Sequence, residues 1–305
     1  VLYELERKIR GDSLKLLRTL KMNVKLMIFP ALPFIIGLLI ADVIEHSPLR
    51  LRIFFISHSY IYWVIMSVIL VIAFIKAPIF IKHIWKTYPL PNGAIRNKIK
   101  QLANKYNIRF RDLWVWNVEG PKVANAGMAG LLPSSRYIFI TDSLLNNFTE
   151  DEIETIVAHE FGHIKYKHVL SYLFFSIGYI IFYTFLYIIT IPISEKFHVN
   201  NVISSLLSAS FTLIFFCLYF VIIFRYLSRR FEIQSDIFAL EATGKPESFR
   251  NALIKLSSIN YIPKITPKLT SIFRTHPSIH QRLELVDKFI LKAPEISVYR
   301  KPVFS

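Results

Sequence analysis

The sequence predicts a mainly α-helical, polytopic membrane protein with about four transmembrane helices and a cytoplasmic region that includes a small β-sheet. Apolar residues make up 53% of the 305 residues, charged residues make up only 19%, and the mean hydropathy is +0.41. Because a soluble domain usually has about 25% charged residues, this composition favours a membrane protein. The single cysteine, Cys217, excludes an internal disulfide framework and a four-cysteine metal site.

Four stretches without charged side chains are the predicted transmembrane helices. A helix needs about 20 apolar residues to cross the hydrocarbon core of a bilayer. The second, third and fourth stretches have 23, 26 and 23 residues, whereas the first is shorter and contains two prolines. The four stretches comprise residues 26–41, 53–75, 169–194 and 202–224.

The basic residues lie almost entirely on one side of this topology. Of the 37 Lys and Arg residues, 33 fall within residues 1–21, 76–168 and 225–305. The positive-inside rule makes that side cytoplasmic, either of a bacterial inner membrane or of the endoplasmic reticulum. The net charge of +16 raises the alternative of nucleic-acid binding, but basic residues that flank the spans do not form one contiguous patch. We therefore expect a lipid bilayer and no nucleic acid as partner.

The spans divide the chain into four segments. We expect a basic N-terminal segment and two transmembrane helices in residues 1–87, and a soluble segment in residues 88–168. A transmembrane hairpin would follow in residues 169–224, and a cytoplasmic segment with C-terminal helices in residues 225–305. The sequence begins with Val1 instead of Met, so we expect either that an initiating segment was removed or that the chain is part of a longer protein.

The soluble segment combines helical and strand patterns. Apolar residues at helical spacing predict a helix over residues 95–107, and short apolar runs predict strands at residues 113–117 and 136–141. A second helix is expected to open at Thr149, because Glu152 completes a capping box and acidic residues favour the positive end of the helix dipole.

The second helix carries a metal-binding pattern, His159-Glu160-Phe161-Gly162-His163. Residues four apart share a helix face, so His159 and His163 can bind one zinc ion (Zn²⁺) from a single rigid element. Glu160 is then placed to act as a base on the water bound to that metal.

A third ligand is expected from the C-terminal segment. Zinc in a catalytic site needs three protein ligands and an open position for water. A metzincin would have Gly at position 166 and His at position 169, but the chain has Tyr166 and Val169. The other common arrangement takes a Glu from a second helix, and Glu232 follows the fourth predicted span. Asp236 lies on the same helix face as Glu232 and is expected to accept the spare N–H of a ligand histidine.

Further motifs follow one another along the chain. They are Asn125-Ala126 with Gly130, residues 136–145, His159 to His163, residues 229–239, and residues 275–278 followed by Arg282. With these motifs the chain resembles the integral-membrane zinc metallopeptidases that include the CAAX prenyl proteases and the bacterial HtpX-type quality-control proteases. The resemblance covers roughly residues 88–170 and 220–290, and this combination is far more specific than His159 to His163 alone.

The resemblance implies roles for four more residues. In this family the strand with the Asn-Ala motif lies beside the active-site cleft and pairs with the substrate backbone, so Asn125 and Ala126 are expected to hold the peptide. His276 matches the family histidine that binds substrate or stabilises the oxyanion of the scissile carbonyl. Arg282 is expected to form a structural ion pair.

Two branches of the family remain open. CAAX prenyl proteases have more than four spans and usually an aromatic residue where this chain has Gly127, so the span count suits the HtpX type. The sequences of residues 142–145 and 231–234, however, are more similar to those of the CAAX branch.

These residues together predict a zinc-dependent endopeptidase that hydrolyses peptide bonds at the cytoplasmic membrane face. Its substrate would be a peptide or protein, either in CAAX processing of a prenylated protein or in quality control of a misfolded membrane protein. The alternative is a catalytically inactive, zinc-bearing membrane scaffold, but such a scaffold would have no need of Glu160. For His168 a position near the site is one alternative, but a membrane-boundary residue is expected more than a ligand.

Overall fold

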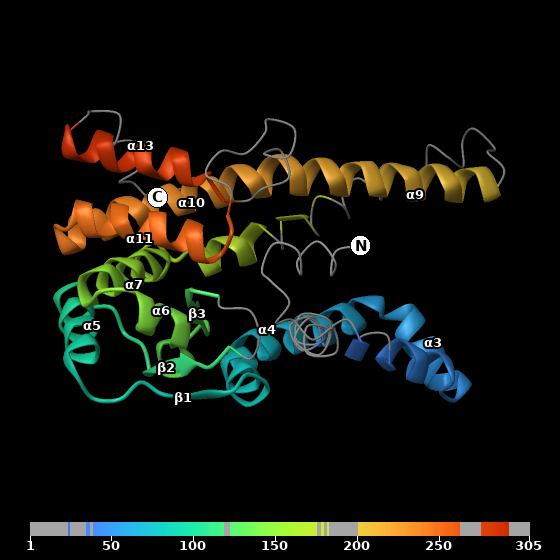
Figure 1. Ribbon diagram of the computed structural model, residues 1–305. Coiled ribbons are helices and arrows are strands. Elements are labelled where there is room, and N and C mark those ends of the chain that lie inside the picture. Colours follow the sequence, from blue (N-terminus) through green and yellow to red (C-terminus); the bar gives the residue numbers. More distant parts are fainter. Residues whose placement is uncertain are drawn as a thin grey trace, which may run out of the picture. The chain divides into compact units, whose positions relative to one another are not determined.

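The computed structural model of the protein describes residues 24, 35–36, 39–118, 123–175, 178–179, 182, 201–262 and 276–292. In this part the chain is mostly helical, and four strands form one mixed sheet (Figure 1). The predicted combination of a mainly helical chain with a small sheet is therefore confirmed. The chain divides into two compact units. The first comprises Val1–Thr149 with Ile259–Tyr261, and the second comprises Glu150–Ser258 with Ile262–Ser305.

The first unit begins with helices and continues into the sheet. Its elements are α3 (Leu49–Ser57), α4 (Ser59–Ile84), β1 (Thr87–Pro89), α5 (Ala94–Lys105), β2 (Asp112–Trp116), β3 (Ala126–Ala129), β4 (Tyr137–Thr141) and α6 (Asp142–Asn147). The predicted helix over residues 95–107 and the two predicted strands correspond to α5, β2 and β4, with bounds that differ by one or two residues.

The sheet has the strand order β1-β2-β4-β3. β2 and β4 are parallel, while β1 and β3 join the sheet as antiparallel strands. All five residues of β4 are buried, as expected for a central strand covered on both faces. Within the described part of the chain β3 lies at one edge of the sheet, where it pairs Ala126 with Ile140 and Gly127 with Phe139.

The second unit is built from helices. They are α7 (Glu150–Lys165), α9 (Asn201–Leu218), α10 (Arg225–Thr243), α11 (Pro246–Ile259) and α13 (Ile279–Ile290). A π-helical segment, Tyr219–Phe224, joins α9 to α10. The backbone is right-handed helical on both sides of this segment, so α9 and α10 form one continuous helix. α10 ends at Thr243 and is capped by Gly244, whose φ of +64° allows its N–H to donate to the carbonyl oxygen of Leu240.

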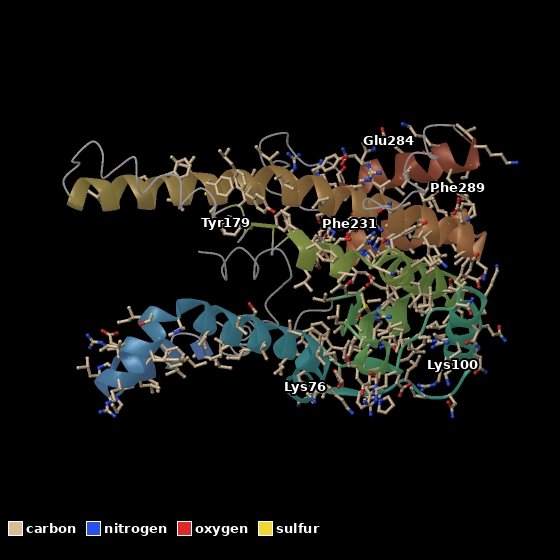
Figure 2. The ribbon with its side chains drawn as sticks, turned by 180° about the vertical axis from the view of Figure 1, so that it is seen from behind. Lys76, Lys100, Tyr179, Phe231, Glu284 and Phe289 are labelled. Carbon is tan, nitrogen blue, oxygen red and sulfur yellow. The ribbon has the colours of Figure 1, made fainter. Side chains whose placement is uncertain are left out.

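Two apolar clusters hold α10 in this unit. Phe231, labelled in Figure 2, is buried with Phe175 and Leu227. Further along α10, Ile237 packs against Leu285 of α13. α10 also packs along α7, so it is supported by α7 and α13.

The predicted spans are described to different extents. Most of the stretch at residues 26–41 and most of the stretch at residues 169–194 lie outside the described residues. The stretch at residues 53–75 is divided between α3 and α4, and the stretch at residues 202–224 between α9 and the π-helical segment. Among the helices that the structure describes, none combines the length and the apolar character required to cross a membrane.

Candidate metal centre

The metal-binding pattern lies in the C-terminal half of α7, whose first turn is acidic. Glu150, Asp151 and Glu152 occupy this turn and interact favourably with the positive end of the helix dipole. Lys255 donates a hydrogen bond to Glu152 over 2.7 Å, and Lys245 donates to Asp151 over 2.7 Å. These lysines connect the first turn of α7 to the chain that follows α10.

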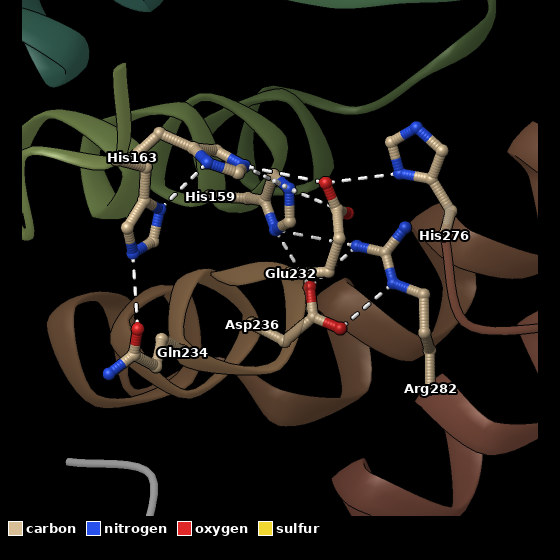
Figure 3. A network of polar contacts seen from close by, with 8 residues as sticks. His159, His163, Glu232, Gln234, Asp236, His276 and Arg282 are labelled. Atoms are coloured by element: carbon tan, nitrogen blue, oxygen red, sulfur yellow. Dashed lines mark hydrogen bonds and ion pairs between the residues drawn. The ribbon is translucent and has the colours of Figure 1, made fainter. Parts of the chain in front are cut away.

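His159, His163 and Glu232 form a cluster that could hold a metal ion (Figure 3). The two Nε2 atoms of His159 and His163 lie 3.2 Å apart. The Glu232 carboxylate oxygens lie 3.5 Å from Nε2 of His159 and 3.7 Å from Nε2 of His163. Donors that surround one zinc ion tetrahedrally at its usual bond lengths lie roughly 3.3–3.5 Å apart. The donor set and its spacing therefore fit a single metal ion.

α7 and α10 approach closely at this cluster because Gly162 has no side chain. A Cβ atom on Gly162 would lie 2.7 Å from the Cα of Ser235, a distance that real contacts do not reach. Ser235 lies between Glu232 and Asp236 in sequence and is fully buried. The glycine in the His159–His163 pattern thus determines how near the α10 carboxylates come to the histidines.

Asp236 orients His159 from the side opposite to the cluster. Nδ1–H of His159 donates to Asp236 over 2.7 Å, which leaves Nε2 of His159 for the cluster. Arg282 of α13 donates two hydrogen bonds to the same carboxylate, from Nη2 over 2.6 Å and from Nε over 2.8 Å. Asp236 is completely buried, so this bidentate pair neutralises a charge that has no access to water.

The charges of the cluster determine its protonation in the metal-free protein. Burial disfavours the charged form of His159, but hydrogen bonds to Asp236 and Glu232 outweigh this effect and raise its pKa to about 10. Burial and the positive charge of His159 lower the pKa of His163 to about 3. Glu232 and Asp236 are buried, yet their cationic partners hold both carboxyl pKa values below the ordinary range. Two carboxylates, one imidazolium and one neutral imidazole therefore occupy this site near neutral pH.

The two predicted catalytic residues, Glu160 and His276, are both at least partly accessible to solvent. Glu160 is half-buried on α7, directly after His159. His276 precedes α13, and its side chain is 69% exposed. Nδ1 of His276 lies 3.0 Å from a carboxylate oxygen of Glu232, and this contact raises the pKa of His276.

A comparison with known protein families agrees with this geometry. The sequence profile of peptidase family M48 matches residues 89–290, which is more than half of the chain. The chain belongs to peptidase family M48. The predicted resemblance to the membrane metallopeptidases that include CAAX prenyl proteases and HtpX-type proteases is confirmed. An M48 metallopeptidase uses a metal ion, and the cluster of two histidines and one glutamate offers a place for it.

Relatives of this M48 chain come from both branches. It is 29% identical over 238 residues to the CAAX prenyl protease 1 homolog of Arabidopsis thaliana, which covers 74% of this chain and 55% of that protein. It is 26% identical over 210 residues to the protease HtpX homolog of Campylobacter concisus, which covers 61% of this chain and 70% of that protein. The chain spans about half the length of the CAAX prenyl protease 1 relatives that it matches.

The fold of the M48 chain is similar to that in the crystal structure of S. mikatae Ste24p. The TM-score is 0.69 at 21% sequence identity, and the match covers 90% of this chain and 68% of that one. At this level of identity the likeness concerns the fold.

The predicted peptide-binding residues lie in the first unit of the M48 chain. The Asn125 side chain is exposed, whereas Ala126 is buried as the first residue of β3. The backbone of Asn125 is fixed against β4. Its N–H donates to the hydroxyl of Thr141, and its carbonyl oxygen accepts from the N–H of Thr141, each over 2.9 Å.

Sequence reasoning missed two polar residues beside the cluster, His168 and Gln234. Both are 1% exposed. Nδ1 of His168 lies 2.9 Å from Nδ1 of His163, and Nε2 of His168 lies 3.1 Å from the amide oxygen of Gln234. Burial lowers the pKa of His168 to about 4. His168 was expected at a membrane boundary, and its position five residues after His163 gave no signal, because neighbours on a helix face lie three or four residues apart.

Proposed function

We propose that the chain is a zinc-dependent membrane endopeptidase that hydrolyses peptide bonds at the cytoplasmic membrane face. The observation that carries this proposal is the donor triangle of His159, His163 and Glu232. The two Nε2 atoms lie 3.2 Å apart, and one Glu232 oxygen lies 3.5 Å from Nε2 of His159 while the other lies 3.7 Å from Nε2 of His163. Two imidazole nitrogens and a carboxylate suit zinc better than magnesium or calcium, which prefer oxygen ligands. A bound zinc ion would supply a Lewis acid that polarises the scissile carbonyl and makes water a stronger nucleophile at neutral pH.

The residues of the chain then have separate tasks. His159, His163 and Glu232 hold the metal, and Asp236 with Arg282 keeps His159 in the tautomer that presents Nε2. Glu160 takes a proton from the attacking water and passes it to the leaving amine. His276 is exposed and raised in pKa, so it can donate a hydrogen bond to the oxyanion that develops on the scissile carbonyl.

The edge strand β3 is the proposed binding site for the peptide backbone. An extended peptide can add to an exposed sheet edge through main-chain hydrogen bonds. Asn125 and Ala126 begin this strand, and the Asn125 side chain is exposed where it could hold a substrate carbonyl or amide.

The membrane part of the proposal is supported by composition. The chain is 53% apolar, and its long uncharged stretches alternate with basic segments that the positive-inside rule puts on the cytoplasmic side. This topology suits either a bacterial inner membrane or the endoplasmic reticulum. The lipid bilayer is then a partner, and nucleic acid is not.

The substrate is proposed to be a prenylated CAAX protein or a misfolded membrane protein. Each possibility corresponds to one group of relatives, the CAAX prenyl protease 1 homologs and the HtpX homolog. A direct comparison would offer the detergent-purified chain a farnesylated CAAX peptide, the same peptide without the farnesyl group, and an unfolded protein. Cleavage restricted to the farnesylated peptide would support CAAX processing, whereas cleavage of the unfolded protein would support quality control.

The experiment that tests the endopeptidase compares wild type with Glu160→Gln. We expect about one zinc ion per chain in both proteins and peptide cleavage only in wild type, because Glu160 is not a metal ligand in this scheme. Glu284→Gln is the matched control, since Glu284 is an exposed carboxylate on α13 beside His280, and this variant should keep full activity. Zinc in both proteins without cleavage in either would support the inactive scaffold, and a folded wild type that binds no zinc would contradict the mechanism.

A further inference from the structure

We propose that His168 and Gln234 are positioning residues of the metal centre, which hold His163 in the tautomer that presents Nε2 to the metal. The proposal rests on the metal-binding part of the proposed function. It concerns a chain of hydrogen bonds that starts at an amide oxygen on α10 and ends at the cluster (Figure 3).

A turn in the backbone brings His168 beside His163. α7 ends at Lys165, and Lys167 has a φ of +56°, which stops the helix. Helical structure resumes at residues 168–175. Without this turn, two residues five apart on a helix would not face each other, because a continuous helix brings together only residues three or four apart.

The His168 ring is held in place by aromatic packing. It stacks on Phe231 with ring centroids 4.1 Å apart and an angle of 11° between the ring planes. Tyr166 stacks on it as well, at 5.8 Å and 20°. These stacked rings hold the plane of the His168 ring, and only 1% of its surface is exposed. Its two nitrogens can therefore reach only the partners that lie at the edge of the ring.

The amide of Gln234 determines the direction of the hydrogen bonds. Its oxygen only accepts, so Nε2 of His168 carries the proton and donates over 3.1 Å. Nδ1 of His168 is then a lone-pair acceptor, and Nδ1–H of His163 donates to it over 2.9 Å. The remaining nitrogen of His163, Nε2, is left without a proton. It faces Nε2 of His159 at 3.2 Å, which is the position that a metal ligand requires.

The two histidine ligands are thus oriented by different means. Asp236, a carboxylate, orients His159, whereas a neutral amide and a neutral imidazole orient His163. A second carboxylate behind His163 would add a negative charge to a buried site that already contains Glu232 and Asp236. A neutral relay gives the same tautomer without that electrostatic cost.

The test measures zinc affinity of the full chain in detergent by competition with a chromophoric chelator. His168→Leu removes the acceptor for His163, and His168→Asn keeps an oxygen at the same distance along the side chain. Gln234→Met removes the acceptor for His168 with little change in volume and leaves the His168 ring in place. Loss of such a partner weakens metal binding by about 10- to 100-fold. We expect this loss in His168→Leu and Gln234→Met, and partial recovery in His168→Asn.

Two further readouts separate positioning from packing. The visible spectrum of bound Co²⁺ should change in His168→Leu and Gln234→Met and resemble wild type in His168→Asn. The thermal unfolding temperatures of the metal-free variants should not rank in the same order as their zinc affinities. Equal affinities in the Leu and Asn variants, or affinity losses that parallel the unfolding temperatures, would overturn the proposal. A wild type that binds zinc but cleaves no peptide would contradict the endopeptidase and leave this comparison of affinities intact.

Discussion

Gly162 of α7 and Ser235 of α10 mark a close approach of the two helices that carry the metal-binding residues. A Cβ atom on Gly162 would lie 2.7 Å from the Cα of Ser235 and 3.0 Å from its Cβ. The backbone of α10 therefore occupies the space that any other residue at position 162 would need. The distance between the histidine pair and Glu232 depends on this contact.

Gly162→Ala should weaken zinc binding and lower the stability of the chain. The added methyl group displaces α10, and overpacking of a buried contact costs about 1–3 kcal/mol. We expect a lower unfolding temperature together with a lower zinc affinity, measured by chelator competition. Gly93→Ala is the control, because a Cβ there meets no atom within 4 Å. Equal behaviour of the two variants would show that α10 accommodates the methyl group without moving Glu232.

Arg282→Met should be far more destabilising than the same change at Arg250. Arg282 pairs with the fully buried Asp236, and removal of one partner of such a buried pair costs about 3–5 kcal/mol. The variant leaves Asp236 with His159 as its remaining charged partner. Arg250 pairs with Asp287, which is half exposed, and such a pair contributes about 0–1 kcal/mol. Chemical denaturation of both variants checks the difference. Similar free energies of unfolding would mean that Asp236 finds another partner or becomes protonated.

The metal-free protein should lose stability as the pH rises above neutral. The pKa of His159 is about 10 in the folded chain and 6.5 ordinarily, so its protonation stabilises the fold fully below pH 6.5. That contribution disappears as the pH rises from 6.5 toward 10. Thermal unfolding with a chelator present should show this decline, and His159→Gln should lack it. An unfolding temperature of wild type that stays constant over this range would contradict the raised pKa.

Zinc uptake should release about one proton per ion at pH 6. His159 is protonated in the metal-free protein and must lose a proton to bind the metal, whereas His163, with a pKa of about 3, is already neutral. Titration calorimetry in buffers of different ionisation enthalpy measures this number. At pH 6 the water on zinc, with a pKa of about 7, contributes little to it. Release of two protons would mean that His163 is also charged before zinc binds.

His276→Ala should reduce peptide cleavage without removing zinc. His276 is exposed and lies 3.0 Å from Glu232, but it is not part of the donor triangle. Loss of one donor to the oxyanion usually lowers kcat by about 100- to 1,000-fold. His280→Ala is the control, since His280 is exposed on the first turn of α13 and pairs with Glu284. A zinc-free His276→Ala protein would instead assign His276 to metal binding.

Local helix geometry explains why much of the site could be predicted from sequence. His159 and His163, and likewise Glu232 and Asp236, are four residues apart, and helical spacing alone puts each pair on one face. The strands β2 and β4 also followed from two apolar runs, whereas β3 was expected only from the family resemblance and β1 was too short to stand out.

The residues that sequence reasoning missed depend on tertiary contacts. His168 reaches His163 only because the backbone turns at Lys167, and its ring is fixed by Phe231 from a distant helix. Gln234 points toward His168, and the helical spacing of residues within α10 does not predict this contact. Such contacts require the packing of α10 on α7, which depends in turn on Gly162.

The separation of the centre's residues along the chain has a consequence for its synthesis. Asp236 is 77 residues from His159 and 46 residues from Arg282. During translation the histidines, Glu232 and Asp236 emerge before α13, so Asp236 lacks its bidentate partner Arg282 until α13 has left the ribosome and folded back. A nascent chain that stops before residue 279 would hold every ligand and still lack a stable centre. The order of synthesis thereby delays assembly of the complete metal centre until α13 has been made.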